Sequence, residues 1–320
     1  MRAALLVLVG AIAAVLAACG TGDTETSERS LAALTAPSTS ATTTTTAPKC
    51  VDVPPRPPTL PAVPSRDEAA AADEFMRNLE HRTNQQLVVA VDENTVGLSS
   101  RNPATGRLEG TEIDVAKRIA QDVFGGNADD HVKFVTVTTK QKVDFPRDRT
   151  VDLAISAISI TCTRASDVAF SDPYLRTEHE YLVPQGSPIH DKRDVAGARV
   201  CMTKGSTSIA ILDGYNDEFR RERRPQAKPV LVDTRNDCHL QLQEGTVDAY
   251  LGHATFLRGM LDQDPGVRAV NEGTISRYAI AMSKKTDHTY FVQYVNAMLA
   301  DLRAEGVLPA LASVDQGRTE

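Results

Sequence analysis

The stretch VDLAISAISITCTR, residues 151–164, decides the fold, and the stretch VAFSDPY follows it at residues 168–174. Seven of the first ten residues, 151–160, are apolar, and the small hydroxyl residues Ser156 and Ser159 stand toward the end of this run. A short apolar run without polar alternation is typical of a strand that is buried on both faces of a sheet. We therefore expect a buried strand over residues 151–160 whose end exposes backbone N–H groups.

An arginine follows this expected strand and is suited to binding an anion. Arg164 lies five residues after Ser159, and its planar guanidinium can bind a carboxylate through two parallel hydrogen bonds. Together with the N–H groups at the strand end, Arg164 favours recognition of an α-carboxylate. The alternative is a surface salt bridge between Arg164 and Asp167 or Asp172, and the spacing alone supports both interpretations.

Strands and helices alternate along the rest of the chain, as judged from apolar runs and from apolar residues at helical spacing. The expected strands cover residues 87–91, 132–137, 199–202, 229–232 and 247–251. The expected helices cover residues 113–123, 205–212, 234–244 and 291–305. Such alternation predicts open, largely parallel α/β sheets, and two blocks of it predict two lobes that face each other. Ligands of open α/β sheets bind in the crevice at the strand ends.

The N-terminus predicts export. Residues 1–18 combine a charged start, an apolar run from Ala3 to Val15 and small residues before Cys19, which describes a secretory signal peptide too short to span a bilayer. The ending Leu-Ala-Ala-Cys resembles the lipobox of bacterial lipoproteins, whose cysteine is acylated, for example with palmitate, and becomes the mature N-terminus. We therefore expect a lipid on Cys19 to hold the chain at the outer face of the cytoplasmic membrane. The alternative is an ordinary signal peptide in which Cys19 is incidental.

Residues 19–65 predict a disordered tether with a proline-rich arm. The segment shows no hydrophobic periodicity, contains five consecutive threonines at residues 42–46 and ends in a run of prolines. Such a composition cannot bury enough apolar surface to offset the entropy of the chain.

Charge and cysteine content exclude several classes of function. The net charge is −7, and there is no long basic run, which argues against a nucleic-acid partner. Besides Cys19 there are four cysteines, an even number that favours two disulfides in an exported chain but allows three pairings. Because no two cysteines have zinc-ligand spacing, we expect neither a metal nor a cofactor. The sequence also shows no nucleophile elbow, no His-Glu-x-x-His motif and no acid pair, so we do not expect an enzyme.

The block at residues 151–174 resembles the signature of the extracellular solute-binding proteins of family 3, which deliver polar amino acids to ABC importers. Three further blocks are similar to the family's pattern and stand in the family's order: GTEIDVA at 110–116, GST at 205–207 and EGTVDA at 244–249. Within the family, the chain is most similar to the glutamine/glutamate-type binders of actinobacteria.

This resemblance implies a periplasmic-binding-protein-like fold of type II, with two α/β lobes joined by two crossover strands. The crossovers are expected near residues 181–183 and 278–280. Lobe 1 would then comprise residues 66–182 and 278–320, and lobe 2 residues 183–277. The resemblance also implies a monomeric binding protein that captures an amino acid of the glutamate, glutamine, aspartate or asparagine class and presents it to an ABC permease. The sequence does not separate transport from a role as a ligand sensor for a membrane signalling system.

The same resemblance assigns roles to residues of the expected cleft. Arg164 clamps the α-carboxylate of the ligand, Ser159 supplies a backbone N–H and a hydroxyl, and Ala157 offers its carbonyl. Asp92 lies near the amino or side-chain end of the ligand. Thr207 and Ser208 lie at a helix N-terminus, where free N–H groups and the helix dipole favour an anion.

Three positions either depart from the family's pattern or leave the identity of the ligand undecided. Glu112 replaces the usual aspartate and is expected to change packing more than contacts. Lys142 matches a basic residue of several acidic-amino-acid binders and would face a side-chain carboxylate; the alternative is a solvated lysine. His253 stands where the family has the aspartate that binds the α-ammonium. Either a neutral His253 and Asp92 hold the ammonium, or the ligand is a dicarboxylate without an α-amino group, or His253 points away from the cleft.

The resemblance extends to cysteines beside the arginine loop and within the second lobe. It implies a disulfide between Cys201 and Cys238 inside lobe 2. The remaining pair, Cys50 and Cys162, would fasten the proline-rich arm to the loop that carries Arg164.

Overall fold

The computed structural model describes residues 74–284 and 289–309 of the chain. The expected signal peptide, the lipidation site Cys19, the tether at residues 19–65 and the cysteine at position 50 lie outside these residues. Within the described ranges, no helix has the length and apolar character that crossing a membrane requires.

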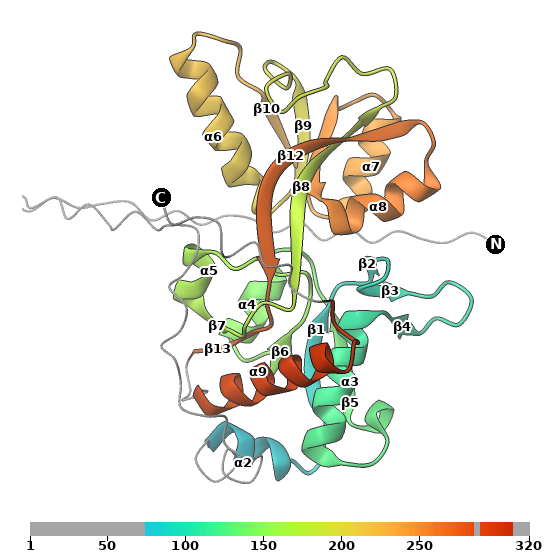
Figure 1. The fold of residues 1–320 in the computed structure, drawn as a ribbon, viewed down its shortest axis with the longest axis vertical. Helices are drawn as coiled ribbons and strands as arrows, with labels where there is room; N and C mark the ends of the chain where they lie inside the picture. Colours follow the sequence, from blue (N-terminus) through green and yellow to red (C-terminus); the bar gives the residue numbers. More distant parts are fainter. Residues whose placement is uncertain (1–73, 285–288, 310–320) are drawn as a thin grey trace, which may run out of the picture. The chain divides into compact units, whose positions relative to one another are not determined.

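Lobe 1 is built on a five-stranded sheet with the strand order β5-β1-β6-β13-β7 (Figure 1). Its strands are β1 (Leu87–Val91), β5 (Val132–Thr136), β6 (Leu153–Ala154), β7 (Val168–Phe170) and β13 (Ala281–Ser283). Its helices are α2 (Glu74–Glu80), α3 (Thr111–Phe124), the short η1 (Ala128–Asp130), α4 (Gln141–Arg147), α5 (Cys162–Asp167) and α9 (Thr289–Ala304). The strands β1, β5 and β6 are parallel, whereas β13 runs antiparallel to β6 and β7.

Lobe 2 is built on a second five-stranded sheet with the order β10-β9-β11-β8-β12. Its strands are β8 (Leu175–Pro184), β9 (Arg199–Thr203), β10 (Lys228–Val232), β11 (Ala249–His253) and β12 (Val267–Tyr278). Its helices are α6 (Ser208–Arg221), α7 (Arg235–Gln243) and α8 (Ala254–Gln263). The parallel part, β10-β9-β11, follows the strand–helix alternation of the sequence.

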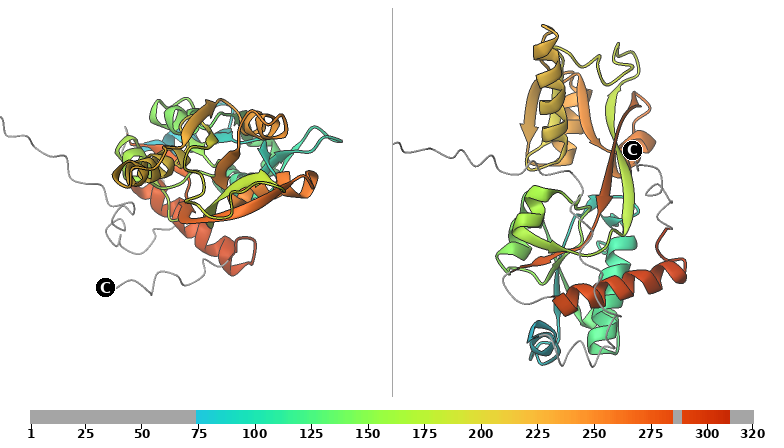
Figure 2. Two further views of the ribbon diagram at one scale, coloured as in Figure 1. Left: turned by 90° about the horizontal axis from the view of Figure 1, so that it is seen from above. Right: turned by 60° about the vertical axis from the view of Figure 1, so that its left-hand side comes forward.

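Two long antiparallel strands, β8 and β12, connect the lobes. They pair from Leu175 with Tyr278 at one end to Pro184 with Val267 at the other, with one irregularity between Asn271 and Ile275. Figure 1 and the turned views of Figure 2 show this pair running side by side between the two sheets. The prediction of a two-lobe α/β fold with two crossover strands is confirmed.

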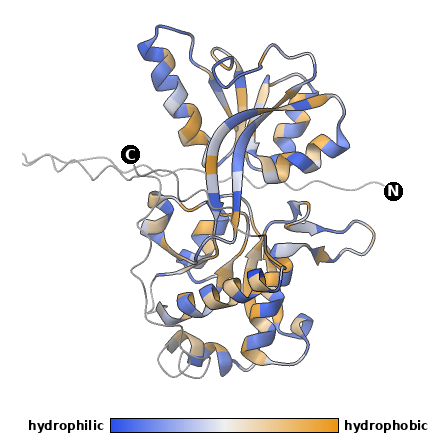
Figure 3. Ribbon diagram, viewed as in Figure 1, coloured by the Kyte–Doolittle hydropathy of each residue, from blue (hydrophilic) through white to orange (hydrophobic). Residues whose placement is uncertain are grey.

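The apolar residues of each lobe form its own core. The largest cluster of buried side chains lies in lobe 1 and includes strand β1, helix α3 and helix α9. Two further clusters lie in lobe 2, on helices α6 and α8 and the strands between them. Figure 3 shows that these helices carry hydrophobic and hydrophilic residues together, as expected where one face of a helix packs on a sheet.

The expected long strand over residues 151–160 is only partly present. Strand β6 ends at Ala154, and Ala157 adopts the left-handed backbone conformation with φ of 48°. The chain returns to a strand partner only at Ser159, which forms an isolated bridge with Tyr278. Residues 155–160 therefore form a bent loop, and the following helix α5 was not expected. Its first turn is stabilised by Thr161, whose hydroxyl accepts from the backbone N–H of Arg164 at 3.2 Å.

A small three-stranded sheet was also not expected. It comprises β2 (Asn94–Thr95), β3 (Ser99–Arg101) and β4 (Leu108–Glu109), between strand β1 and helix α3.

The disulfide between Cys201 and Cys238 is confirmed, with an S–S distance of 2.01 Å and Cα atoms 5.6 Å apart. It joins strand β9 to helix α7 inside lobe 2. The pairing of Cys50 with Cys162 stays a prediction, because position 50 lies outside the described residues.

Candidate functional site

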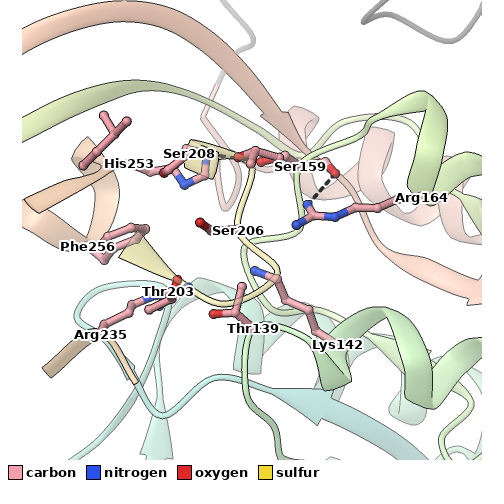
Figure 4. Close-up of a pocket in the computed structure, with 12 residues that line it drawn as sticks. Thr139, Lys142, Ser159, Arg164, Thr203, Ser206, Ser208, Arg235, His253 and Phe256 are labelled. Carbon is pink, nitrogen blue, oxygen red and sulfur yellow. Dashed lines mark hydrogen bonds between the residues drawn. The ribbon is translucent and has the colours of Figure 1, made fainter. Parts of the chain in front are cut away.

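A pocket lies where the loops of the two lobes meet (Figure 4). Lobe 1 contributes Thr139, Lys142, Ser159 and Arg164, and lobe 2 contributes Thr203, Ser206, Thr207, Ser208, Arg235, Leu251, His253 and Phe256. The position agrees with the expectation that the ligand site lies in a crevice between the lobes. Hydroxyl groups and cations make up most of its lining.

Arg164 reaches from lobe 1 to the backbone of lobe 2. Its Nη1 donates to the carbonyl oxygen of Ser159 at 2.9 Å, and its Nη2 donates to the carbonyl oxygen of Gly205 at 2.9 Å. Gly205 has φ of 77°, and a Cβ there would lie 3.3 Å from the Cα of Lys140, so this close approach of the lobes favours glycine. Among the described residues Arg164 forms no salt bridge, and the alternative of pairing with Asp167 or Asp172 is wrong. Burial lowers the pKa of Arg164 to about 10, so it stays charged at neutral pH.

Lys142 is buried, with 4% of its surface exposed, and the alternative of a solvated lysine is wrong. Its Nζ donates to the carbonyl oxygens of Ser156 at 3.2 Å and Ala157 at 3.0 Å. Burial, with the nearby charges of Arg235 and Arg164, lowers its pKa well below the ordinary value. Figure 4 shows the ammonium pointing into the pocket from helix α4.

Glu112 holds the bent loop at residues 155–160 in place through its buried side chain. Its carboxylate is fully buried and accepts hydrogen bonds from the backbone N–H of Ala157 at 2.7 Å, from the Ser99 hydroxyl at 2.7 Å and from the Tyr174 hydroxyl. Burial raises its pKa. Glu112 therefore binds the loop directly, and the expectation that replacing the usual aspartate changes packing more than contacts stays a prediction. The Ala157 carbonyl, expected to face the ligand, is instead an acceptor for Lys142.

His253 lines the pocket at the end of strand β11, so the alternative that it points away is wrong. Its Nε2 lies 3.2 Å from the hydroxyl oxygens of both Ser159 and Ser276. Burial lowers its pKa well below the ordinary value, and the nearby His179, Lys142, Arg235 and Arg164 lower it further. His253 is therefore neutral at physiological pH and can offer or accept a hydrogen bond without carrying charge.

Asp92 is paired with Arg235, a pocket residue that the sequence analysis missed. The Oδ2 atom of Asp92 lies 2.6 Å from the Nη1 atom of Arg235, and both side chains are largely buried. Because Asp92 follows β1 and Arg235 begins α7, this ion pair joins the lobes. Arg235 could have been noticed in the sequence, since a cation in the first turn of a helix is disfavoured by the helix dipole.

The N-terminus of helix α6 and the two residues before it bring three hydroxyl groups to the pocket. The Thr207 hydroxyl lies 3.2 Å from Nε2 of His179, and Ser208 is buried. The Ser206 hydroxyl is buried and has no hydrogen-bond partner in the described part of the chain. Since buried polar groups are nearly always paired, Ser206 is a candidate for direct contact with a ligand.

The charges around the pocket favour an anionic ligand. Three side chains of its lining, Lys142, Arg164 and Arg235, are basic, whereas no carboxylate lines it. The nearest acids, Asp92 and Glu112, are engaged with Arg235 and with the bent loop. Within residues 74–284 and 289–309, no group of three potential ligands could hold a metal ion.

Comparison with known proteins agrees with this geometry. The sequence pattern of the bacterial extracellular solute-binding proteins, family 3, matches residues 87–313. An ABC transporter glutamine-binding protein of Bacillus subtilis is 28% identical over 70% of this chain and 79% of its own length. A glutamine-binding protein of Geobacillus stearothermophilus is 29% identical over 68% of this chain and 80% of its own. The arginine-bound form of the truncated ArgBP from T. maritima superposes with a TM-score of 0.62 at 23% identity, covering 71% of this chain and 99% of that one.

Proposed function

The chain belongs to the bacterial extracellular solute-binding proteins of family 3, and from this premise we propose that it captures an acidic amino acid for an ABC importer. Members of the family are binding proteins and not enzymes. Glutamate and aspartate are the proposed ligands, ahead of glutamine and asparagine.

The observation that carries this proposal is the excess of positive charge around the pocket. With a zwitterionic amino acid, the three basic side chains of the lining would still outnumber the two nearby acids, Asp92 and Glu112. This uncompensated buried charge carries a large desolvation cost. An acidic amino acid adds one negative charge and reduces that cost. The glutamine-binding relatives support an amino-acid ligand, and the charge of this pocket favours the acid over the amide.

We place the α-carboxylate between the lobes, at Arg164. The N-terminus of α6, with its free N–H groups, lies on the other wall of the pocket, and the Ser206 hydroxyl just before the helix has no partner among the described residues. A ligand that contacts both walls binds the closed arrangement better than an open one, which is the physical basis of capture by lobe closure. The ammonium would lie near neutral His253 and the hydroxyl of Ser159.

A second candidate ligand is a dicarboxylate without an α-amino group. The observation that favours it is that His253 replaces the ammonium-binding carboxylate and that Asp92 is already paired with Arg235. A ligand with two carboxylates and no ammonium would meet the basic side chains of the pocket and would need no carboxylate in the lining.

In the proposed setting, the exported chain is held at the outer face of the cytoplasmic membrane by lipid on Cys19. It would present its closed, ligand-bound form to an ABC permease. This part of the proposal rests on the N-terminal sequence and on the family, in which an ABC transporter protein is a relative.

A thermal-shift screen tests the ligand class, because binding to the folded state raises the melting temperature. The panel contains glutamate, aspartate, glutamine, asparagine, arginine, succinate and 2-oxoglutarate. We expect the largest shifts from glutamate and aspartate. The largest shift from arginine would overturn the proposal, and the largest shift from succinate or 2-oxoglutarate would select the second candidate. Loss of radiolabelled uptake in a deletion strain tests the link to import.

A further inference from the structure

We infer that Arg235 determines ligand specificity: its guanidinium binds the side-chain carboxylate of the ligand and makes the pocket select an acid over its amide. This inference rests on the proposed function, in which Arg164 holds the α-carboxylate of an amino acid. It gives a role to a residue that lies outside the sequence blocks shared with the family.

The guanidinium of Arg235 is held in place from several sides. Its Nη1 contacts Oδ2 of Asp92 at 2.6 Å and donates to the hydroxyl of Thr95. Its plane lies over the ring of Phe256, with the central carbon 4.2 Å from the ring centroid. Only 6% of the residue is exposed. A buried, oriented fork of this kind is prepared for a planar acceptor and needs little reordering when one binds.

Part of this fork remains available to a ligand. Both interactions with Asp92 and Thr95 use Nη1. Within the described residues, Nε and Nη2 of Arg235 donate no hydrogen bond to another protein group. Because Arg235 lines the pocket, these atoms are the donors that a ligand carboxylate would meet.

Arg164 and Arg235 lie on different sides of the pocket. Figure 4 shows Arg164 on one side, Arg235 on the other, and Ser206, Thr203 and Thr139 between them. A ligand with a carboxylate at each end matches this arrangement. The amide of glutamine matches it less well, since one of its two terminal groups is an NH₂ that donates hydrogen bonds and would face the donors of Arg235.

Lys142 is the other basic residue that a side-chain carboxylate could meet. Its ammonium has three donors, of which two are used by the carbonyl oxygens of Ser156 and Ala157. We therefore assign Lys142 mainly to holding the bent loop. Substituting it should loosen this loop and weaken every ligand.

Asp92 has a different role in the same arrangement. Its carboxylate offsets the charge of Arg235, which would otherwise be a bare cation at a helix N-terminus. Asp92 also competes with a ligand for the guanidinium. Removing Asp92 should therefore keep or increase the preference for an acid, whereas removing Arg235 should abolish it.

The experiment measures dissociation constants for glutamate and glutamine by calorimetry and compares their ratio, Kd(glutamine)/Kd(glutamate), among variants. We expect the ratio to fall at least tenfold, toward one, in Arg235→Gln and to stay the same or rise in Asp92→Asn. Arg235→Lys keeps the positive charge but not the planar guanidinium, so we expect an intermediate ratio. If Arg235→Gln does not fold, Arg235→Lys provides the test. The exposed Arg258→Gln, outside the pocket lining, should leave the ratio within twofold of wild type.

Other outcomes overturn the inference. If Arg235 acts only as an ion-pair link between the lobes, Arg235→Gln and Asp92→Asn weaken both ligands equally and the ratio does not move. A ratio that falls in Asp92→Asn as far as in Arg235→Gln has the same consequence. If wild type binds neither ligand, the proposed function itself fails, whereas an unchanged ratio with intact binding refutes only the role of Arg235.

Discussion

The imidazole rings of His179 and His253 face each other across neighbouring strands, with their centroids 4.0 Å apart. Nδ1 of His179 lies 3.2 Å from the carbonyl oxygen of Thr274, which requires a proton on that nitrogen, so Nε2 accepts from the Thr207 hydroxyl. Burial lowers the pKa of both histidines. Protonating His253 would add a further positive charge beside Lys142 and the two pocket arginines.

This relationship predicts how ligand affinity depends on pH. Burial lowers the pKa of His253 well below the ordinary value, and we expect the residue to stay neutral between pH 7.5 and 5.5. We expect the affinity for glutamate to change by less than about threefold across this range, because an ionisation outside the range cannot alter binding. Calorimetric titrations at both pH values measure it. A tenfold tighter complex at pH 5.5 would show instead that an imidazolium binds a second carboxylate.

The same shift predicts a dependence of stability on pH. In the unfolded chain His253 titrates near pH 6.5, whereas in the folded chain it takes up a proton only at lower pH. The unfolded state therefore binds more protons below about pH 6.5, and stability falls as the pH drops, by up to about 1.4 kcal/mol per pH unit for this residue. Chemical denaturation of wild type and of His253→Gln between pH 7 and 5.5 isolates the effect. Equal slopes for the two proteins would contradict it.

Arg164 should be required for binding every ligand. Arg164→Ala removes a charge-assisted contact worth about 3 kcal/mol to the ligand carboxylate, so we expect at least about a 100-fold loss of affinity. Arg164→Lys should lose nearly as much, because a point charge cannot replace the fork. Calorimetry provides the measurement, and Arg147→Ala, at a surface arginine paired with Asp144, is the control. An alanine variant within a few-fold of wild type would mean that Arg164 only joins the lobes through Gly205.

Several elements could be predicted from the sequence because their signals are local. The apolar run at 87–91 and the helical spacing over 113–123 correspond to β1 and α3 within a few residues. The cysteine pair and the position of Arg164 followed from the resemblance to the family. Each depends on neighbours in the sequence or on a motif, and so can be recognised in one chain.

The rest depends on contacts between distant residues. The apolar run at 151–160 bends after Ala154 because Glu112 and Lys142, from two separate helices, bind the main chain of Ala157. Arg235 enters the pocket because α7 is positioned by its packing in lobe 2 and because Asp92 meets it from the other lobe. No periodicity or spacing in the sequence predicts contacts of this kind between distant residues.

Glu112 should support both stability and binding. In Glu112→Gln the amide nitrogen would face one of three donors, namely the Ala157 N–H, the Ser99 hydroxyl or the Tyr174 hydroxyl. A buried donor left without an acceptor costs about 1–3 kcal/mol. We expect denaturant unfolding to show a loss of this size, and calorimetry to show weaker glutamate binding because the loop before Ser159 loosens. The exposed Glu244→Gln is the control. Unchanged stability in Glu112→Gln would show that the Glu112 carboxylate does not stabilise the fold.

The disulfide between Cys201 and Cys238 should stabilise lobe 2 and help to position Arg235. It closes a segment of 37 residues, for which a contribution of about 2–4 kcal/mol is expected. Cys238 lies three residues after Arg235 on helix α7, so breaking the bond should loosen the helix that carries the guanidinium. We expect the double substitution Cys201→Ala and Cys238→Ala to lower the melting temperature and to weaken glutamate more than glutamine. Reductant should lower the melting temperature of wild type more than that of the double variant, in which the predicted Cys50–Cys162 bond is the one left to reduce. A double variant with the same melting temperature as wild type would show that packing alone holds α7 against β9.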